Sequence, residues 1–245
     1  MSHADADEKA ALLIGIYNSY LGLGRLDMAR SVLDHALSLD LKHLGIRMDL
    51  DFLLPCLMAE EGRWAEAAAA FATLLDRYHD ALARPEYRYL YEGIQVRRAR
   101  ALVSTGQFAS AIPVAREALS FDAVRPAEMQ GLRFDLGVSL QATGNKEAAA
   151  EELRRVVAFE LGDELEVRAL WRLANFDFER GALAQAKEKL EIILRNYPEP
   201  NPEVSRRDIY EGLANVFRLL GDRAQEMEYA ALASKALRPD KRVPR

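Results

Sequence analysis

A glycine followed by a regular series of small and large residues recurs six times along the chain, and this repetition constrains the fold more than any other feature. The glycines stand at positions 24, 62, 106, 144, 181 and 221, so successive copies are 38, 44, 38, 37 and 40 residues apart. Sequence periods of this length are typical of supersecondary units that stack on one another. The sequence therefore predicts a stack of six similar units.

Each of these turn glycines separates two segments with helical periodicity. In front of Gly144, Leu132, Leu136 and Leu140 recur every four residues, and behind it Leu153 belongs to a second helical pattern. A glycine between two helices can adopt the left-handed backbone conformation that ends the first helix. No stretch alternates apolar and polar residues for long, as a strand would. We therefore expect an all-α fold of about six antiparallel helix pairs, or about twelve helices.

The prolines agree with this division in most places. Pro85, Pro126 and Pro202 stand where new helices are expected to begin, and proline suits a first helical turn because its missing N–H has no partner there. Pro55 and Pro113 lie inside expected helices, where each should bend the helix. Asn201 is a suitable N-cap before Pro202.

An alanine follows the turn glycine by five positions in the first five copies. Two helices joined by a tight turn approach closely only where their side chains are small, so we expect these alanines at the contact within each pair. They are Ala29, Ala67, Ala111, Ala149 and Ala186. The apolar residues nine and twelve positions after the glycine should fill the space beside them. The sixth copy has Glu226 in place of the alanine, which suits a polar terminal unit.

The repeated unit resembles the tetratricopeptide repeat. The likeness is clearest over residues 136–153, where a Leu–Gly pair precedes the turn glycine, and in the second copy, which has Trp64 and Phe71. It covers roughly residues 10–238, although the copies exceed the family's length of about 34 residues and Arg98 stands where a core leucine is usual. The resemblance implies a right-handed α-solenoid with a concave groove lined by the first helix of each pair. We expect residues 1–9 to be a disordered tail, residues 10–238 a single solenoid and residues 239–245 a flexible tail.

Composition excludes several classes of function. The formal net charge is −5 and charged residues make up 29% of the chain, whereas a nucleic-acid-binding protein would favour a basic excess. The single cysteine, Cys56, excludes an internal disulfide and a cysteine metal cluster. The polar, acidic start does not suit a secretory signal, and no apolar run is long enough to cross a bilayer. We expect a cytoplasmic protein with no nucleic-acid partner and no membrane insertion.

The resemblance implies a non-catalytic scaffold or adaptor that binds a partner peptide or helix in its groove. The family pattern and helical spacing select the candidate groove residues, which are Asn18, Arg97, Arg100, Arg168, Trp171, Arg172, Asn175, Asn215 and Arg218. Asparagine amides can bind a partner's main chain, arginines favour carboxylate or phosphate groups, and tryptophan can anchor an apolar side chain. The expected partner is therefore a protein or peptide with acidic or carboxylate groups. In the alternative interpretation, Trp171 is a core residue and the arginines form salt bridges.

Enzyme chemistry is not expected, and neither is a metal or a cofactor. The four histidines have no ligand spacing, and Cys56 lies in the apolar run FLLPCLM, which indicates a buried, inert thiol. Three other functions remain open. They are a phosphopeptide reader resembling the 14-3-3 family, suggested by RYLYE at residues 88–92; a self-assembling scaffold whose uncovered final helix stacks into homo-oligomers; and a regulatory module of a transcription or signalling system.

Overall fold

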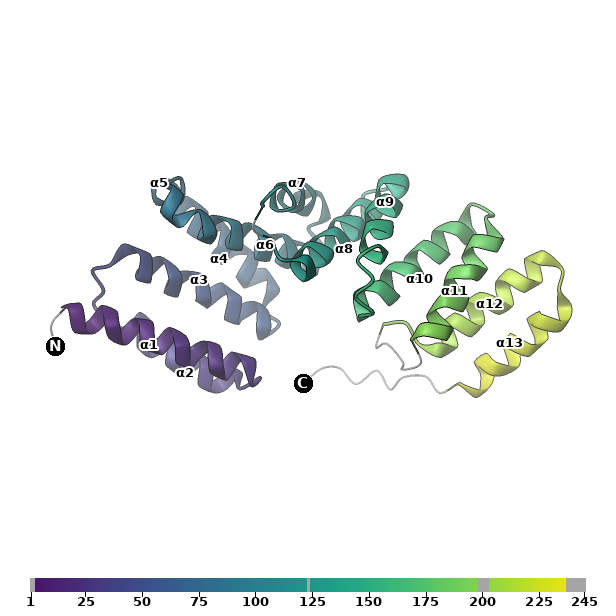
Figure 1. The fold of residues 1–245 in the computed structure, drawn as a ribbon, viewed down its shortest axis with the longest axis horizontal. Coiled ribbons are helices and arrows are strands. Elements are labelled where there is room, and N and C mark those ends of the chain that lie inside the picture. Colours follow the sequence, from purple (N-terminus) through teal and green to yellow (C-terminus); the bar gives the residue numbers. More distant parts are fainter. Residues whose placement is uncertain (1–2, 123, 198–202, 237–245) are drawn as a thin grey trace. The chain divides into compact units, whose positions relative to one another are not determined.

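The computed structural model of the protein describes residues 3–122, 124–197 and 203–236. Within these ranges the chain forms thirteen α-helices, one short 3₁₀-helix and no strand (Figure 1). The chain divides into two compact units, Met1–Val124 and Arg125–Arg245. The all-α fold predicted from the sequence is confirmed. The single solenoid expected over residues 10–238 stays a prediction.

The first unit contains three antiparallel helix pairs. The pairs are α1 (His3–Gly22) with α2 (Leu26–Leu37), α3 (Leu44–Glu60) with α4 (Trp64–Arg77), and α6 (Arg88–Ser104) with α7 (Phe108–Ala118). The short helix α5 (His79–Leu82) and the 3₁₀-helix η1 (Pro85–Tyr87) connect the second pair to the third. These two elements account for the longest spacing between turn glycines, 44 residues. The first helix of each later pair packs on the second helix of the pair before it, α3 on α2 and α6 on α4.

The second unit also contains three pairs. They are α8 (Pro126–Ala142) with α9 (Lys146–Val157), α10 (Glu164–Glu179) with α11 (Leu183–Asn196), and α12 (Arg206–Leu220) with α13 (Arg223–Lys235). Successive pairs join in the same way as in the first unit, with α10 on α9 and α12 on α11. The unit's core includes Leu190, Ile193, Leu213 and Val216, each almost fully buried.

The contacts expected within the pairs are confirmed. All five alanines that follow a turn glycine by five positions are fully buried, at 0% exposure. The residues nine and twelve positions after the glycine are also buried in these five copies. The six turn glycines have φ between 68° and 87°, the left-handed conformation that favours glycine. In the sixth copy, Glu226 lies partly exposed near the start of α13.

Several predicted boundaries need correction. Residues 3–9 are helical, because α1 begins at His3 and Ala6 and Ala10 are buried. The prediction of a disordered tail over residues 1–9 is therefore wrong for residues 3–9, which the structure describes. Pro126 begins α8 as expected, whereas Pro85 begins η1, so that α6 starts three residues later. Asn201, Pro202 and residues 239–245 lie outside the described residues.

The two internal prolines do not break their helices. Pro55 lies within α3 and Pro113 lies within α7. Pro55 is buried, whereas Pro113 is exposed. Packing against neighbouring helices therefore maintains α3 as a continuous element despite the backbone hydrogen bond that a proline removes.

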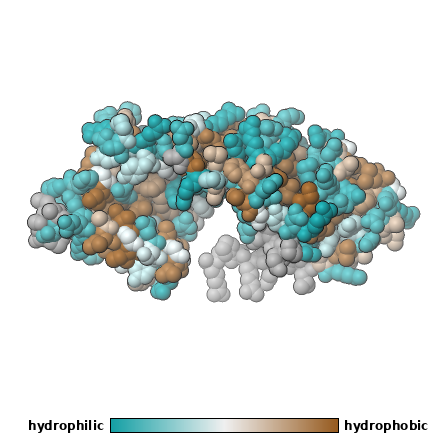
Figure 2. All heavy atoms as spheres, viewed as in Figure 1, coloured by the Kyte–Doolittle hydropathy of each residue, from teal (hydrophilic) through white to brown (hydrophobic). Residues whose placement is uncertain are grey.

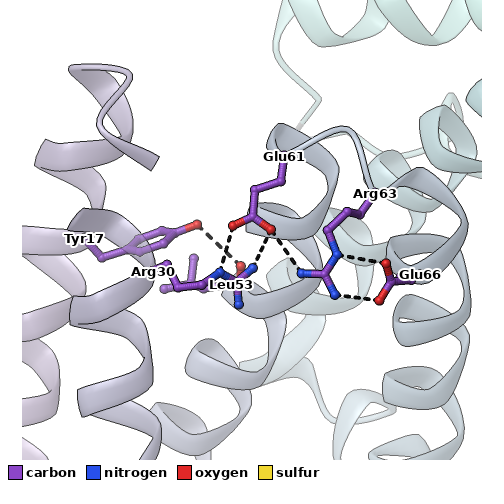
Figure 3. Close-up of polar contacts among 6 residues, drawn as sticks. All are labelled: Tyr17, Arg30, Leu53, Glu61, Arg63 and Glu66. Atoms are coloured by element: carbon purple, nitrogen blue, oxygen red, sulfur yellow. Dashed lines mark hydrogen bonds and ion pairs between the residues drawn. The ribbon is translucent and has the colours of Figure 1, made fainter. Parts of the chain in front are cut away.

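A network of ion pairs joins the first two helix pairs (Figure 3). Arg30 of α2 donates two hydrogen bonds to the carboxylate of Glu61, at 2.7 and 2.6 Å. Arg63 donates to the same carboxylate at 3.1 Å and also binds Glu66. The hydrogen bond from Arg30, followed by that from Arg63, lowers the pKa of Glu61. The turn after α3 is thereby attached to α2 by a two-point contact, which is stronger than a single ion pair.

Candidate functional site

The predicted residues of α10 contact two different neighbours, α8 and α12. Arg168 and Arg172 face α8, where their guanidinium carbons lie 4.4 and 5.8 Å from the centroid of the Phe134 ring. Arg172 also donates a hydrogen bond to Oε1 of Gln141 at 2.7 Å. Both arginines therefore contact the preceding helix pair.

These two arginines have partners within the protein. Nε of Arg168 lies 2.7 Å from Oε2 of Glu203, in the segment before α12. Burial lowers the pKa of Arg172, and the neighbouring charge of Arg168 adds to the effect. The Phe134 ring beneath them is itself buried. For Arg168 and Arg172, the interpretation as packing and ion-pair residues fits these contacts better than a free anion-binding pair does.

Trp171 and Asn175 lie on the part of the same face of α10 that is nearer to α12. Together with Asn215 they line a pocket of about 210 Å³ between α10, α11 and α12. Leu190 and Val216 contribute apolar surface to the pocket. The structure therefore brings together three of the predicted groove residues, one of them aromatic and two of them amides.

A glycine that sequence analysis did not select shapes this pocket. A Cβ atom at Gly212 would lie 3.2 Å from Cδ1 of Leu190 and 3.5 Å from Cζ3 of Trp171. The absence of a side chain lets the tryptophan ring approach α12. An isolated glycine inside a helical pattern is a signal of this kind of close packing, and Gly212 could have been found from it.

The polar groups at the rim of the pocket differ in their availability. Asn215 accepts a hydrogen bond from Arg218 at 3.1 Å through its side-chain oxygen. Within the described ranges, no hydrogen bond is recorded for the side chain of Asn175. Glu211 is ion-paired with Arg207 at 2.7 Å. The pocket thus has an apolar interior, two amides at the rim and Arg218 beside one of them.

The remaining predicted residues lie in the first unit. Asn18 is exposed on α1, and Arg97 and Arg100 are exposed on α6. The positive charge of Arg97 opposes the rise in the pKa of the buried Cys56 thiol, which burial nevertheless raises to about 12. Cys56 is 4% exposed, so the buried thiol expected from the sequence is confirmed.

The RYLYE stretch does not form a free phosphate-binding group. Arg88 is ion-paired with Glu92 at 2.7 Å. The hydroxyl of Tyr89 donates to Asp49 at 2.9 Å, and desolvation together with this hydrogen bond raises the pKa of Tyr89 to about 12. Three of these side chains therefore serve contacts within the first unit.

Two further properties of the described residues bear on the class of site. No group of three or more histidine, cysteine, aspartate or glutamate side chains there is arranged to hold a metal ion. None of the helices is both long enough and apolar enough to cross a membrane.

Comparison with known proteins identifies the repeat. Models of the tetratricopeptide repeat match residues 14–43 and 168–200. No curated protein matches the sequence. Among solved structures, PilF of Pseudomonas aeruginosa is similar with a TM-score of 0.68 at 14% identity, covering 94% of this chain and 93% of that one. The type IV pilus biogenesis factor PilW has a TM-score of 0.65 at 15% identity, with 92% and 93% covered.

A third structure is described by its binding function. YrrB, described as a protein of this repeat class with an unusual peptide-binding site, has a TM-score of 0.56 at 15% identity, covering 75% of this chain and 83% of that one. The matched segments and the buried alanines follow the same repeat. Residues 14–43 and 168–200 are therefore identified as tetratricopeptide repeats, and the chain has the fold of solved proteins of this repeat class.

Proposed function

We propose that this protein is a non-catalytic scaffold that binds an extended segment of a partner protein across α10 and α12. The observation that carries the proposal is the pocket that Trp171, Asn175 and Asn215 line together. An apolar side chain of the partner would enter the pocket, and the two amides would bind its main chain on either side. The comparisons support the general class, since YrrB is described as having a peptide-binding site.

Whether the proposed binding surface prefers acidic partners depends on which of its arginine side chains a partner can reach. Arg168 and Arg172 are engaged with Glu203 and Gln141, so we assign the acidic contact of the second unit to Arg218, which is exposed beside Asn215. Asn18, Arg97 and Arg100 remain proposed contacts on the first unit. A cytoplasmic location, expected from the sequence, remains part of the proposal.

A peptide selection tests this function. A displayed peptide library is selected against the wild-type chain, and the affinity of the recovered peptide is measured by calorimetry. Replacing Asn175 and Asn215 together by alanine should weaken binding about tenfold or more, because each lost hydrogen bond contributes roughly 1 kcal/mol. Asn145→Ala is the matched control, since Asn145 is exposed and makes no side-chain capping bond.

The two variants give distinct outcomes. A peptide whose affinity falls in the double variant and is unchanged in Asn145→Ala supports the groove. A selected peptide that binds the double variant as tightly as the wild type places the binding surface elsewhere and contradicts the proposal. Self-assembly, the second function, is favoured by a separate observation on α1.

A further inference from the structure

The outward side of α1 is apolar and exposed. No charged residue occurs between Ala10 and Gly24. Leu12 and Ile16 of α1 are 71% and 45% exposed, and Leu23, just after the helix ends, is 74% exposed. Leu12, Ile16 and Ser19 recur at helical spacing, so they share one side of the helix. Figure 2 shows hydrophobic surface on this part of the first unit. A helix that is apolar on more than its core side is usually covered by another element.

The same positions in the next repeat form a docking surface. Counting back from the turn glycine, Leu12 and Ile16 of α1 correspond to Leu50 and Leu54 of α3. Leu50 is fully buried, and Leu54 packs against the core that α1, α2 and α3 share. Leu12 and Ile16 of α1 therefore occupy the positions whose side chains, in α3, pack against the preceding helix pair. In α1, however, they lie exposed.

The last repeat is different. The positions that α10 directs towards its neighbour, such as Trp171 and Phe178, correspond in α12 to Glu211 and Arg218. The depression beside α13 is lined by further charged groups, Arg223 and Glu226. Polar outer faces of this kind are typical of terminal capping repeats. Leu219, Leu220 and Met227 are also exposed in the last repeat, but they stand next to charged residues there. The exposed side of α1 has no charged residue between Ala10 and Gly24, and this distinguishes it from the last repeat.

We propose that α1 pairs with α1 of a second copy of this chain in an antiparallel, two-fold dimer. In that arrangement Leu12 of one copy faces Ser19 of the other, and Ile16 faces Gly15. Large residues thus meet small ones in both directions, which an isologous interface requires because each copy contributes the same surface. The two-fold pairing uses only residues of the first unit.

Local geometry supports this close approach. A Cβ atom at Gly15 would have no other atom within 4 Å, so open space lies over the glycine. The hydroxyl of Ser19 already donates to the carbonyl of Gly15 at 3.0 Å, so burial leaves no unpaired donor. Because α1 has 20 residues and is about 30 Å long, the contact is small and should dissociate on dilution.

Sedimentation analysis of the full chain over a wide range of concentrations tests the proposal. The wild type should change reversibly from monomer to dimer. Leu12→Glu should abolish the dimer, since it buries a charge within the contact. Leu219→Glu is the matched control, because Leu219 is also exposed, at 56%, but lies in the last repeat. The control should dimerise like the wild type.

Gly15→Leu separates specific pairing from simple surface stickiness. The substitution adds apolar surface and favours the helix, so the chain should stay folded and melt at the same temperature or higher. It also fills the space that Ile16 of the second copy occupies, so the dimer should weaken about tenfold or more. Tighter association of Gly15→Leu would contradict the proposed packing.

Two other results would overturn the proposal. One is a wild-type chain that remains monomeric at every concentration. The other is a set of oligomers that grow with concentration and disappear in Leu219→Glu, which would indicate head-to-tail stacking through the last repeat.

Discussion

At the scale of single residues, the closeness of paired helices decides which small side chains are replaceable. A Cβ atom at Gly137 of α8 would lie 3.0 Å from Cγ of Leu153, which is fully buried in α9. At Gly15 the same atom would meet nothing within 4 Å. Two glycines inside helices of one protein therefore differ in their surroundings although both lie in helical backbone.

We expect Gly137→Ala to destabilise the protein by about 1 kcal/mol, because overpacking outweighs the gain in helix propensity. Gly15→Ala should stabilise it by up to about 1 kcal/mol, since only the propensity gain applies. Urea unfolding monitored by circular dichroism measures both changes at a low protein concentration. Equal effects of the two substitutions would contradict the tight contact between α8 and α9.

At the scale of helices, two arginines of similar appearance in the sequence are expected to have separate roles. Arg172 covers Phe134 and binds Gln141 between α8 and α10, whereas Arg218 is exposed at the end of α12. Arg172→Ala should lower stability by about 1–2 kcal/mol through the lost ring contact and hydrogen bond. Arg218→Ala should leave the melting temperature nearly unchanged and weaken binding of an acidic peptide. Thermal melting and peptide titration of both variants measure these effects. If Arg172 were a free ligand-binding group, Arg172→Ala would instead weaken peptide binding and leave the melting temperature nearly unchanged.

The junction of α2, α3 and α4 should depend on pH. Arg30 lowers the pKa of Glu61 in the folded protein, so the ion pair stabilises the fold at neutral pH and this contribution is lost as the pH falls through the lowered pKa. Arg30→Ala should therefore be less stable than the wild type at pH 7, by up to about 1 kcal/mol, and equally stable in acid. Denaturant unfolding at several pH values measures the difference.

A control residue makes this comparison specific. Arg116 of α7 is exposed, and no ion pair is recorded for it within the described residues. Arg116→Ala should show no pH-dependent loss of stability. A difference between wild type and Arg30→Ala that persists undiminished in acid would show that Arg30 acts through packing instead of charge.

At the scale of the whole molecule, the chain divides into two compact units, and each should respond mainly to its own mutations. Leu213 is fully buried in the core of the second unit, and Leu213→Ala should cost about 2–5 kcal/mol. Because each repeat contacts only its neighbours, amide exchange should accelerate more in α8–α13 than in α1–α7. Leu50→Ala in the first unit should give the opposite pattern, measured by hydrogen–deuterium exchange and mass spectrometry. Uniform acceleration by both variants would indicate one cooperative unit.

The sequence alone determined the helix pairs. The turn glycines and the buried alanines recur at fixed intervals, and this local geometry is encoded within a few residues of each turn, as Gly144 and Ala149 illustrate. Tertiary structure decided the rest. Arg168 and Trp171 share a helix face by spacing, yet one packs towards α8 and the other towards α12, because neighbouring helices lie on both sides of α10. The close approach of Trp171 to α12 depends on Gly212, and the exposure of Leu12 depends on which helices cover α1. Both features depend on residues that are distant in the sequence, so a local sequence pattern does not predict them.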